Sequence, residues 1–401
     1  QGVSSAASDV YKRQSTRFSL ATFPAGHLPP RIPEALKKIK KERKIVMASL
    51  TYHEQKDIEN IKKLRGLIKE LPPFCADFFR GIEPLTSTRT RIAYAYDLRI
   101  FFDFLKTSNS QVARMGENIP LSVLEQLTVT DLEEYMEYLK CHPSVNNEDV
   151  YNTERGIMRK VSSLKSFYNY FYRNERIEKN PASLLRLPKL HEKEITRLEI
   201  DEVARLLDEV EEGEKLTERQ KLYHERTKVR DLAMLTLLLG TGLRVSECVG
   251  LNINDVDLDA CGVRIFRKGG KESIVYFSDE VRDVLETYLD ERQAIDALPG
   301  HEDAVFLSLQ KKRMSVRTVE NMVKKYAGLV TPLKKITPHK LRSTYGTSLY
   351  RETGDIYLVA SVLGHSDVNT TRKHYAAQED QRRKSARNIV QLREKKEQGP
   401  Q

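Results

Sequence analysis

The sequence lacks any long apolar run: none of its 401 residues belongs to a stretch of about 18 apolar residues, the length that a membrane-spanning helix needs. Its first residues also lack a basic stretch followed by an apolar one, so we expect no secretory signal. Cysteine is scarce, and no Cys-x-x-Cys pair occurs among Cys75, Cys141, Cys248 and Cys261. This scarcity argues against disulfides and a zinc site, and it predicts a protein of the reducing cytoplasm. The lack of a long apolar run predicts that the protein is not bound to a membrane.

Positive charge is in excess. Lysine and arginine number 67 against 57 aspartates and glutamates, so the formal net charge is +10. Hydrophobic residues make up 39% of the chain, which is enough for folded cores. A basic excess of this kind raises the local concentration of polyanions, and DNA or RNA is the commonest such partner.

Changes in composition predict two folded domains. Residues 1–46 are rich in Ser, Ala, Gly and Pro without periodicity, so we expect a disordered or non-native extension, with Met47 as a candidate start. The helical pattern stops at Asn180-Pro181, and an extended charged connector follows. The expected parts are the extension at 1–46, a helical domain at 47–185, a linker at 186–195, a second domain at 196–379 and a basic helical tail at 380–401.

The fold class predicted from these patterns is mainly α with a small antiparallel β-sheet. Apolar residues recur at helical spacing in two stripes: Ile92, Tyr96, Ile100 and Phe104, and then Ile157, Val161, Leu164, Tyr168 and Phe171. Thr130 and Glu133 have the spacing of a capping box. In the second domain two β-rich runs flank residues 268–271, which predicts a hairpin.

Cationic residues of the second domain stand at three places where ligand binding competes with simpler explanations. Arg244 and Glu247 lie three residues apart on one helical face, and on this segment alone a structural ion pair is the simpler interpretation. Lys268 and Lys271 flank two glycines, where surface lysines are common but an ammonium could also be delivered to a groove. His339 and Arg342 fall in the first turns of a predicted helix, where an anion would be stabilised.

The helix with His339 and Arg342 is predicted from Thr337 as its cap and Pro338 at its first position.

The stretch VLGHSDVNTTRKHY adds His365 and then Tyr375, which follows three potentially cationic side chains directly. A phenol is a weak nucleophile at its free pKa of about 10, and nearby cations favour the phenolate as it forms. Tyr345 is an alternative phenol, but it lies on a helix whose pattern favours packing.

In this order, the segments TGLRVSE, KGGKE, HKLRSTYGTSL and LGHSDVNTTRKHY resemble the signature of the tyrosine recombinase (phage integrase) family. The segments AYAYDLRIFFDFL and SSLKSFYNYFYRNERIEKNP look like its core-binding domain. The likeness covers roughly residues 50 to 390 and is closest to the Xer-like and transposon-integrase branch.

The resemblance implies two domains that clamp duplex DNA, a core-binding domain followed by a catalytic domain. Tyr375 would attack the scissile phosphate and form a 3′-phosphotyrosyl link without metal or nucleotide cofactor. The other implied catalytic roles are phosphate binding by Arg244, Arg342 and His365, general acid catalysis by Lys268 and acceptance of the tyrosine proton by His339. Candidate DNA contacts are Lys271, Arg159, Lys165 and Arg89; for Arg159 and Lys165, which lie on the polar face of their predicted helix, an ordinary solvated face is the alternative.

Two further expectations concern assembly and alternatives. The resemblance implies a homotetramer on two DNA sites, in which the tail at 380–401 docks on the neighbouring protomer; a tail folded back on its own domain is the other possibility. Tyr375 lies ten residues after His365, one more than in similar Xer-like sequences. A DNA-binding regulator without strand exchange and a type IB topoisomerase are the competing functions.

Overall fold

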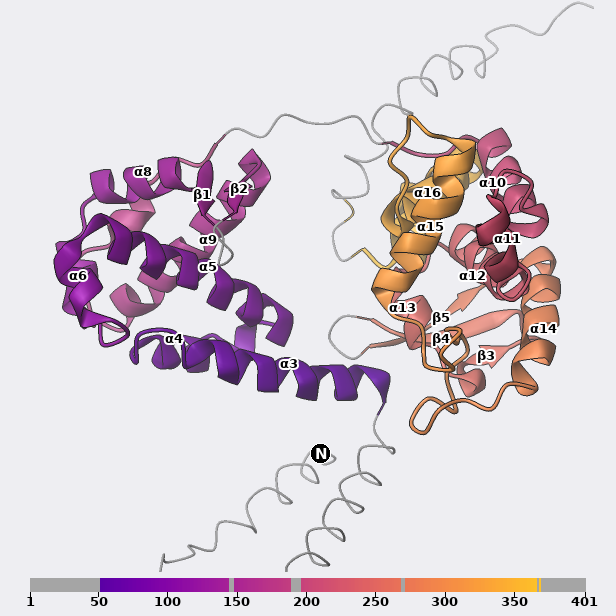
Figure 1. Ribbon diagram of the computed structural model, residues 1–401, viewed down its shortest axis with the longest axis horizontal. Coiled ribbons are helices and arrows are strands. Elements are labelled where there is room, and N and C mark those ends of the chain that lie inside the picture. The colour runs from indigo at the N-terminus through magenta and orange to yellow at the C-terminus, as the bar shows by residue number, and fades with distance from the viewer. Residues whose placement is uncertain (1–50, 144–147, 189–195, 268–270, 366–367, 369–401) are drawn as a thin grey trace, which may run out of the picture. The chain divides into compact units, whose positions relative to one another are not determined.

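The computed structural model describes residues 51–143, 148–188, 196–267, 271–365 and 368. Within these residues the chain is mostly helical with small antiparallel sheets, which confirms the predicted fold class (Figure 1). The predicted extension at 1–46, most of the linker, Lys268, Tyr375 and the tail at 380–401 lie outside the described residues. The proposed domain limits therefore stay predictions.

The first half of the described chain is a helical body with its own hydrophobic core. Its elements are α3 (Tyr52–Ile68), α4 (Cys75–Gly81), η1 (Glu83–Leu85), α5 (Thr88–Ser108), α6 (Ser110–Met115), α7 (Ser122–Gln126), α8 (Val129–Tyr138), β1 (Cys141–Pro143), β2 (Asp149–Tyr151), α9 (Glu154–Arg173) and η2 (Pro181–Leu184).

Helices α5 and α9 form the centre of this body, and both apolar stripes face its core. Ser87 caps α5 by accepting from the Thr90 amide, and Thr153 caps α9 in the same way. The antiparallel pair β1–β2 was not predicted from the sequence. The predicted capping box was wrong by two residues: α8 begins with a box between Thr128 and Asp131.

The second half has a separate core. Its elements are α10 (Ile200–Glu212), α11 (Glu218–His224), α12 (Lys228–Thr241), α13 (Val245–Gly250), η3 (Ile253–Asp255), β3 (Val256–Asp257), β4 (Gly262–Phe266), β5 (Glu272–Tyr276), α14 (Asp279–Gln293), α15 (Val316–Val330), α16 (Pro338–Thr353) and α17 (Ile356–Leu363).

Helix α12 runs through this second core, and its residues from Ala233 to Leu238 are buried on all sides. It ends at Gly242, whose φ of +65° is the left-handed conformation that glycine adopts without strain. A Cβ at this position would come within 2.5 Å of the Tyr345 ring, so close packing also requires glycine here. The end of α12 is thereby held next to α16.

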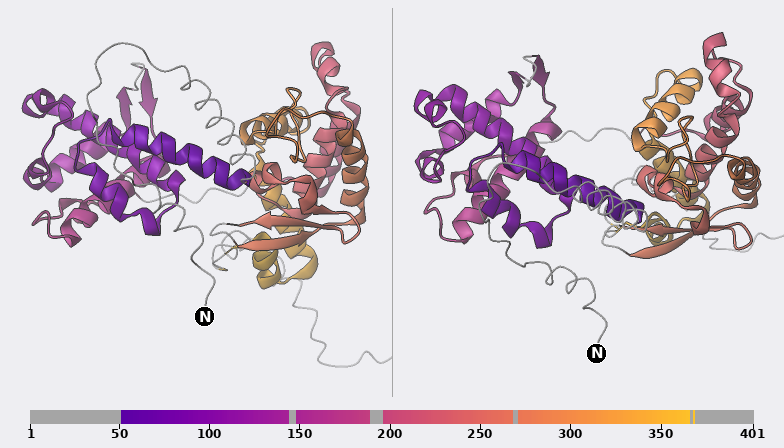
Figure 2. Two further views of the ribbon diagram at one scale, coloured as in Figure 1. Left: turned by 90° about the horizontal axis from the view of Figure 1, so that it is seen from below. Right: turned by 60° about the horizontal axis from the view of Figure 1, so that its bottom comes forward.

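The predicted hairpin is confirmed as β4 and β5, which pair antiparallel from Gly262 opposite Tyr276 to Phe266 opposite Glu272. Strand β3 completes a three-stranded sheet in the order β3-β4-β5. Figure 2 shows these strands running alongside helices of the same half. The Arg267 amide donates to the Lys271 carbonyl at 2.8 Å, so the ladder continues by one step past β4.

Candidate functional site

Arg244 occupies the N-cap position of α13, directly after the glycine-terminated end of α12. Its Nη1 donates to Glu247 Oε1 at 2.8 Å, and its backbone N–H donates to Glu247 Oε2 at 2.8 Å. The Glu247 side chain is 5% exposed, whereas that of Arg244 is 41% exposed. The buried carboxylate therefore holds both the guanidinium and the backbone N–H of Arg244 and leaves part of the guanidinium accessible, so the predicted ion pair is confirmed.

Arg342 lies on α16 and is buried. Its Nη1 donates to the Gly242 carbonyl at 2.6 Å, and its Nη2 donates to the Leu363 carbonyl. One guanidinium thus joins the ends of α12 and α17, which lie more than a hundred residues apart along the chain. Arg342 therefore contacts the backbone at Gly242, two residues before Arg244, the other predicted arginine.

Arg244 and Arg342 both donate hydrogen bonds to carbonyls at the end of α17. Helix α17 ends at Gly364 with φ +61°, and the next amide, that of His365, donates back to the Ala360 carbonyl at 2.9 Å. Arg244 Nη2 donates to the Gly364 carbonyl at 3.3 Å. His365 therefore follows directly on two carbonyls, those of Leu363 and Gly364, that accept from Arg342 and Arg244.

A third arginine at this helix end was missed by sequence reasoning. Arg267 donates through Nη1 to the Ser361 carbonyl at 3.2 Å and through Nη2 to the Val362 carbonyl at 2.8 Å. Burial lowers the pKa of Arg267, nearby Glu247 opposes that shift, and nearby Arg244 adds to it. The one available signal was its position directly before Lys268.

Four consecutive carbonyls at the end of α17 thus accept hydrogen bonds from guanidinium groups. The carbonyl end of a helix carries partial negative charge, which stabilises the three cations held there. Each guanidinium has five donors and uses only some of them on the backbone in these bonds. The arrangement is a preorganised cationic centre that suits a phosphate.

His339 and Pro338 begin α16, one turn before Arg342, with Thr337 at the N-cap position as predicted. No side-chain cap hydrogen bond is made there, so proline at the first position carries the helix start. The His339 side chain is exposed, and its carbonyl accepts from Ser343 Oγ at 3.1 Å.

Tyr345, the alternative phenol, is partly buried beside Gly242. Burial raises its pKa, because an apolar surrounding disfavours the phenolate. This direction is the opposite of what nucleophilic attack needs.

The four candidate DNA contacts differ in how exposed their charged groups are and in how many hydrogen bonds these groups make within the protein. Arg89 and Lys271 are exposed. Arg159 makes two hydrogen bonds to the buried carboxylate of Asp97, at 2.5 and 2.7 Å, and keeps its side chain 51% exposed. Lys165 donates to the carbonyls of Ser183 and Leu185 at the end of the helical body.

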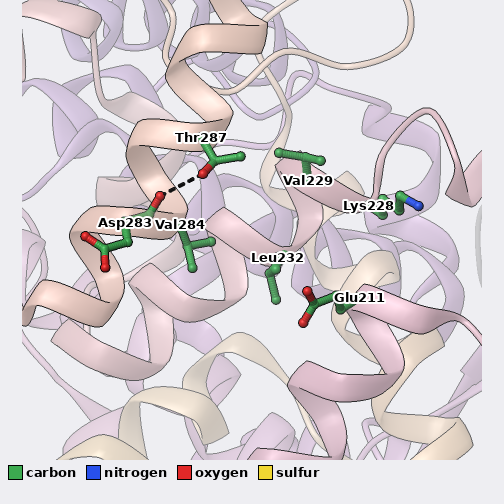
Figure 3. A pocket seen from close by; sticks show the side chains of 7 residues that line it. All are labelled: Glu211, Lys228, Val229, Leu232, Asp283, Val284 and Thr287. Atoms are coloured by element: carbon green, nitrogen blue, oxygen red, sulfur yellow. Dashed lines mark hydrogen bonds between the residues drawn. The ribbon is translucent and has the colours of Figure 1, made fainter.

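A cavity of about 380 Å³ lies elsewhere in the second half and contains none of the predicted site residues. Val229 and Leu232 of α12 and Val284 of α14 form its apolar wall (Figure 3). Glu211, Lys228, Asp283 and Thr287 supply its polar groups, and Thr287 Oγ1 donates to the Asp283 carbonyl at 2.9 Å.

Among the described residues, no helix is both long and apolar enough to cross a lipid bilayer.

Comparison with known proteins shows the family to which this chain is similar. Residues 196–382 match the Phage integrase family. Tyrosine recombinase XerC of Caldanaerobacter subterraneus subsp. tengcongensis is 34% identical over 333 residues, which cover 78% of this chain and 86% of that protein. Tyrosine recombinase XerS of Streptococcus pyogenes is 32% identical over 362 residues, covering 83% of this chain and 98% of that protein.

Solved structures share the fold at lower identity. The XerH site-specific recombinase bound to its palindromic difH substrate, in a post-cleavage complex, aligns with a TM-score of 0.54 and 17% identity, covering 75% of this chain and 79% of that one. The integrase of transposon Tn1549 in complex with transposon right end DNA aligns with a TM-score of 0.54 and 19% identity, covering 79% of this chain and 99% of that one.

Proposed function

This chain belongs to the phage integrase family of tyrosine recombinases, which are site-specific DNA recombinases, and we propose that Tyr375 is the nucleophile with which it cuts and rejoins DNA. In the first step the phenolic oxygen attacks the scissile phosphorus and forms a P–O bond, while the bond from phosphorus to the 5′ oxygen breaks. His339 accepts the phenolic proton, and Lys268 gives a proton to the departing 5′ oxygen. The 3′ end of the cut strand is then bonded to the protein.

In the second step the 5′ hydroxyl of another strand attacks the phosphotyrosyl phosphorus while the bond from phosphorus to the tyrosine oxygen breaks. Lys268 takes the proton of the hydroxyl, and His339 returns a proton to the released phenolate. The bond broken and the bond formed are both phosphodiester-type P–O bonds, so their energy is retained in the intermediate. Neither step consumes ATP. The two strands leave the reaction with a new connection.

Arg244, Arg342 and His365 bind the non-bridging oxygens of the phosphate in this proposal. The observation that carries it is the hydrogen bonding of Arg342 and Arg244 to the Leu363 and Gly364 carbonyls, directly before His365. Guanidinium groups fixed in this way need no rearrangement when charge develops in the transition state, which is the condition for strong electrostatic stabilisation.

The test is to trap the covalent intermediate on genomic DNA fragments that carry nicks. Proteolysis and mass spectrometry of the adduct should give a nucleotide on the peptide that contains Tyr375, and sequencing the attached DNA ends should give one recurrent site. A protein that binds a specific site yet traps no DNA would be a regulator. Relaxation of supercoils by single protomers, independent of sequence, would indicate a type IB topoisomerase.

We further propose that residues 47–185 and 196–379 are two domains that hold the duplex between them. Lys271, Arg159, Lys165 and Arg89 are the proposed contacts to the phosphate backbone. Arg89 and Lys271 are exposed, which supports this role. The proposed location is the cytoplasm, where a DNA substrate would be accessible.

The proposed assembly is a homotetramer on two DNA sites, with the tail at 380–401 docked on the neighbouring protomer. The tail carries Ala386, Ile389, Val390 and Leu392 among many basic residues. The cavity lined by α12 and α14 has apolar walls with the carboxylates of Glu211 and Asp283 and the ammonium of Lys228 beside them. In this proposal the two carboxylates are the partners for basic residues of the tail, and the apolar walls receive its apolar stripe.

A further inference from the structure

Arg267 follows the last residue of β4 and is held against the end of α17. Two hydrogen bonds, to the carbonyls of Ser361 and Val362, connect its guanidinium to that helix. Its backbone N–H is used as well, since it donates to the Lys271 carbonyl at 2.8 Å across the hairpin. Both the main chain and the side chain of Arg267 are therefore fixed.

The guanidinium is also packed tightly against backbone. A Cβ at Gly364 would lie 1.9 Å from Arg267 Nη1, and Gly364 itself has φ +61°. Any side chain at this position would both strain the backbone and displace the arginine. The glycine before His365 thus leaves room for the arginine before Lys268.

A stabilising role alone does not account for this arrangement. The Nε of Arg267 is buried and makes no hydrogen bond among the described residues, which is unfavourable for a donor. Arg264 lies three residues earlier, at the centre of β4, and is paired with the carboxylate of Asp255 through Nε at 3.1 Å and Nη2 at 3.0 Å. Arg267 instead meets the helix end to which Arg244 and Arg342 also donate.

We propose that Arg267 is a positioning residue for the leaving-group step: it fixes the end of β4, from which the chain passes directly into Lys268, against the carbonyls that precede His365. The inference rests on the proposed function, in which Lys268 is the general acid. A single guanidinium then fixes the end of β4 to the same helix end that Arg244 and Arg342 contact. Its loss should impair protonation of the 5′ oxygen more than attack by the phenol.

The test compares two nicked duplexes that carry the site found from the trapped ends. One has the natural 5′ bridging oxygen at the scissile phosphate, and the other has sulfur there, since a thiolate leaves without needing a proton. Arg267→Ala should slow single-turnover cleavage of the oxygen substrate by about 10- to 100-fold, part of what a general acid contributes. Cleavage of the sulfur substrate should stay close to the wild-type rate.

Two further variants make the result specific. Arg264→Ala is the matched control on the same strand and should leave the ratio of the two rates unchanged. Arg267→Lys keeps the charge but lacks the planar fork of donors that reaches both carbonyls in a fixed geometry, so it should show the same selective loss to a smaller degree. If Arg267→Ala does not fold, as judged by the lack of a cooperative melting transition, Arg267→Lys replaces it in the test.

Equal slowing of both substrates, or no slowing of either, would overturn the inference. Failure of the proposed function looks different, because the wild-type protein would then cleave neither substrate.

Discussion

Replacing Arg342 by lysine should separate support of the fold from binding of the phosphate. The wild-type guanidinium is buried and donates to two carbonyls, those of Gly242 and Leu363. Lysine keeps the charge but has one ammonium on a flexible stem, so it cannot reproduce the fork of donors. One buried carbonyl therefore loses its charged partner.

The cost to stability follows from that single lost bond. Leaving a buried polar group unpaired costs about 1–3 kcal/mol. For a folded part of the size of the second half of the chain, the midpoint of thermal unfolding should therefore fall by roughly 2–12 °C. Cleavage should suffer much more, because removing one preorganised donor from an oxyanion site typically costs about 10²- to 10³-fold in rate.

The assay is single-turnover cleavage of a nicked site at a temperature where both proteins are folded, with a thermal melt alongside. Arg292→Lys is the matched control: Arg292 is also buried and donates to the carbonyls of Ala304, Ile295 and Glu302, away from the arginine centre. It should lower the melting midpoint comparably and leave cleavage unchanged. Wild-type cleavage by folded Arg342→Lys, or equal losses in both variants, would refute the reasoning.

Three further outcomes are expected. Glu247→Gln should slow cleavage roughly tenfold, about 1.4 kcal/mol, because the neutral amide holds Arg244 less firmly than the carboxylate does; Asp255→Asn is the control, and equal rates in the two variants would contradict this. Deleting residues 380–401 should leave binding of one protomer to a half-site intact and abolish the slow-migrating paired complex in native gels; an unchanged paired complex would exclude a docking role. The logarithm of the binding constant should fall with the logarithm of salt concentration by about 0.9 per neutralised phosphate, so Lys271→Ala should reduce the slope by about one; an unchanged slope would remove Lys271 from the interface.

The elements predicted best from the sequence were those with a local cause. The hairpin of β4 and β5 follows from two β-rich runs on either side of residues 268–271, which include two consecutive glycines in the sequence. The start of α16 follows from Pro338, which fits only the first turn of a helix. The stripe of α9 is buried residue by residue as its spacing predicted.

Predictions that depended on competing local signals were less accurate. Thr130 with Glu133 and Thr128 with Asp131 have the same spacing, and the sequence offers both. The second pair forms the box because Thr128 takes the extended conformation before α8 begins. Spacing alone cannot decide which threonine that will be.

The candidate site was predictable as a set of residue types and not as a set of contacts. Arg244 and Arg342 could be named from their segments, but the carbonyls that orient them belong to residues far away in the chain. Arg267 was missed because an arginine at a hairpin usually indicates a solvated surface. Only the end of α17, placed against it by tertiary packing, shows that this arginine is held.

The most direct test of the central claim is the covalent adduct on a nicked site, measured for Tyr375→Phe and Tyr345→Phe. Each variant removes one phenolic oxygen, and burial already raises the pKa of Tyr345. Tyr375→Phe should bind the duplex nearly as well as wild type and give no adduct, while Tyr345→Phe should still give the adduct. An adduct that persists in Tyr375→Phe would contradict the assignment of the nucleophile.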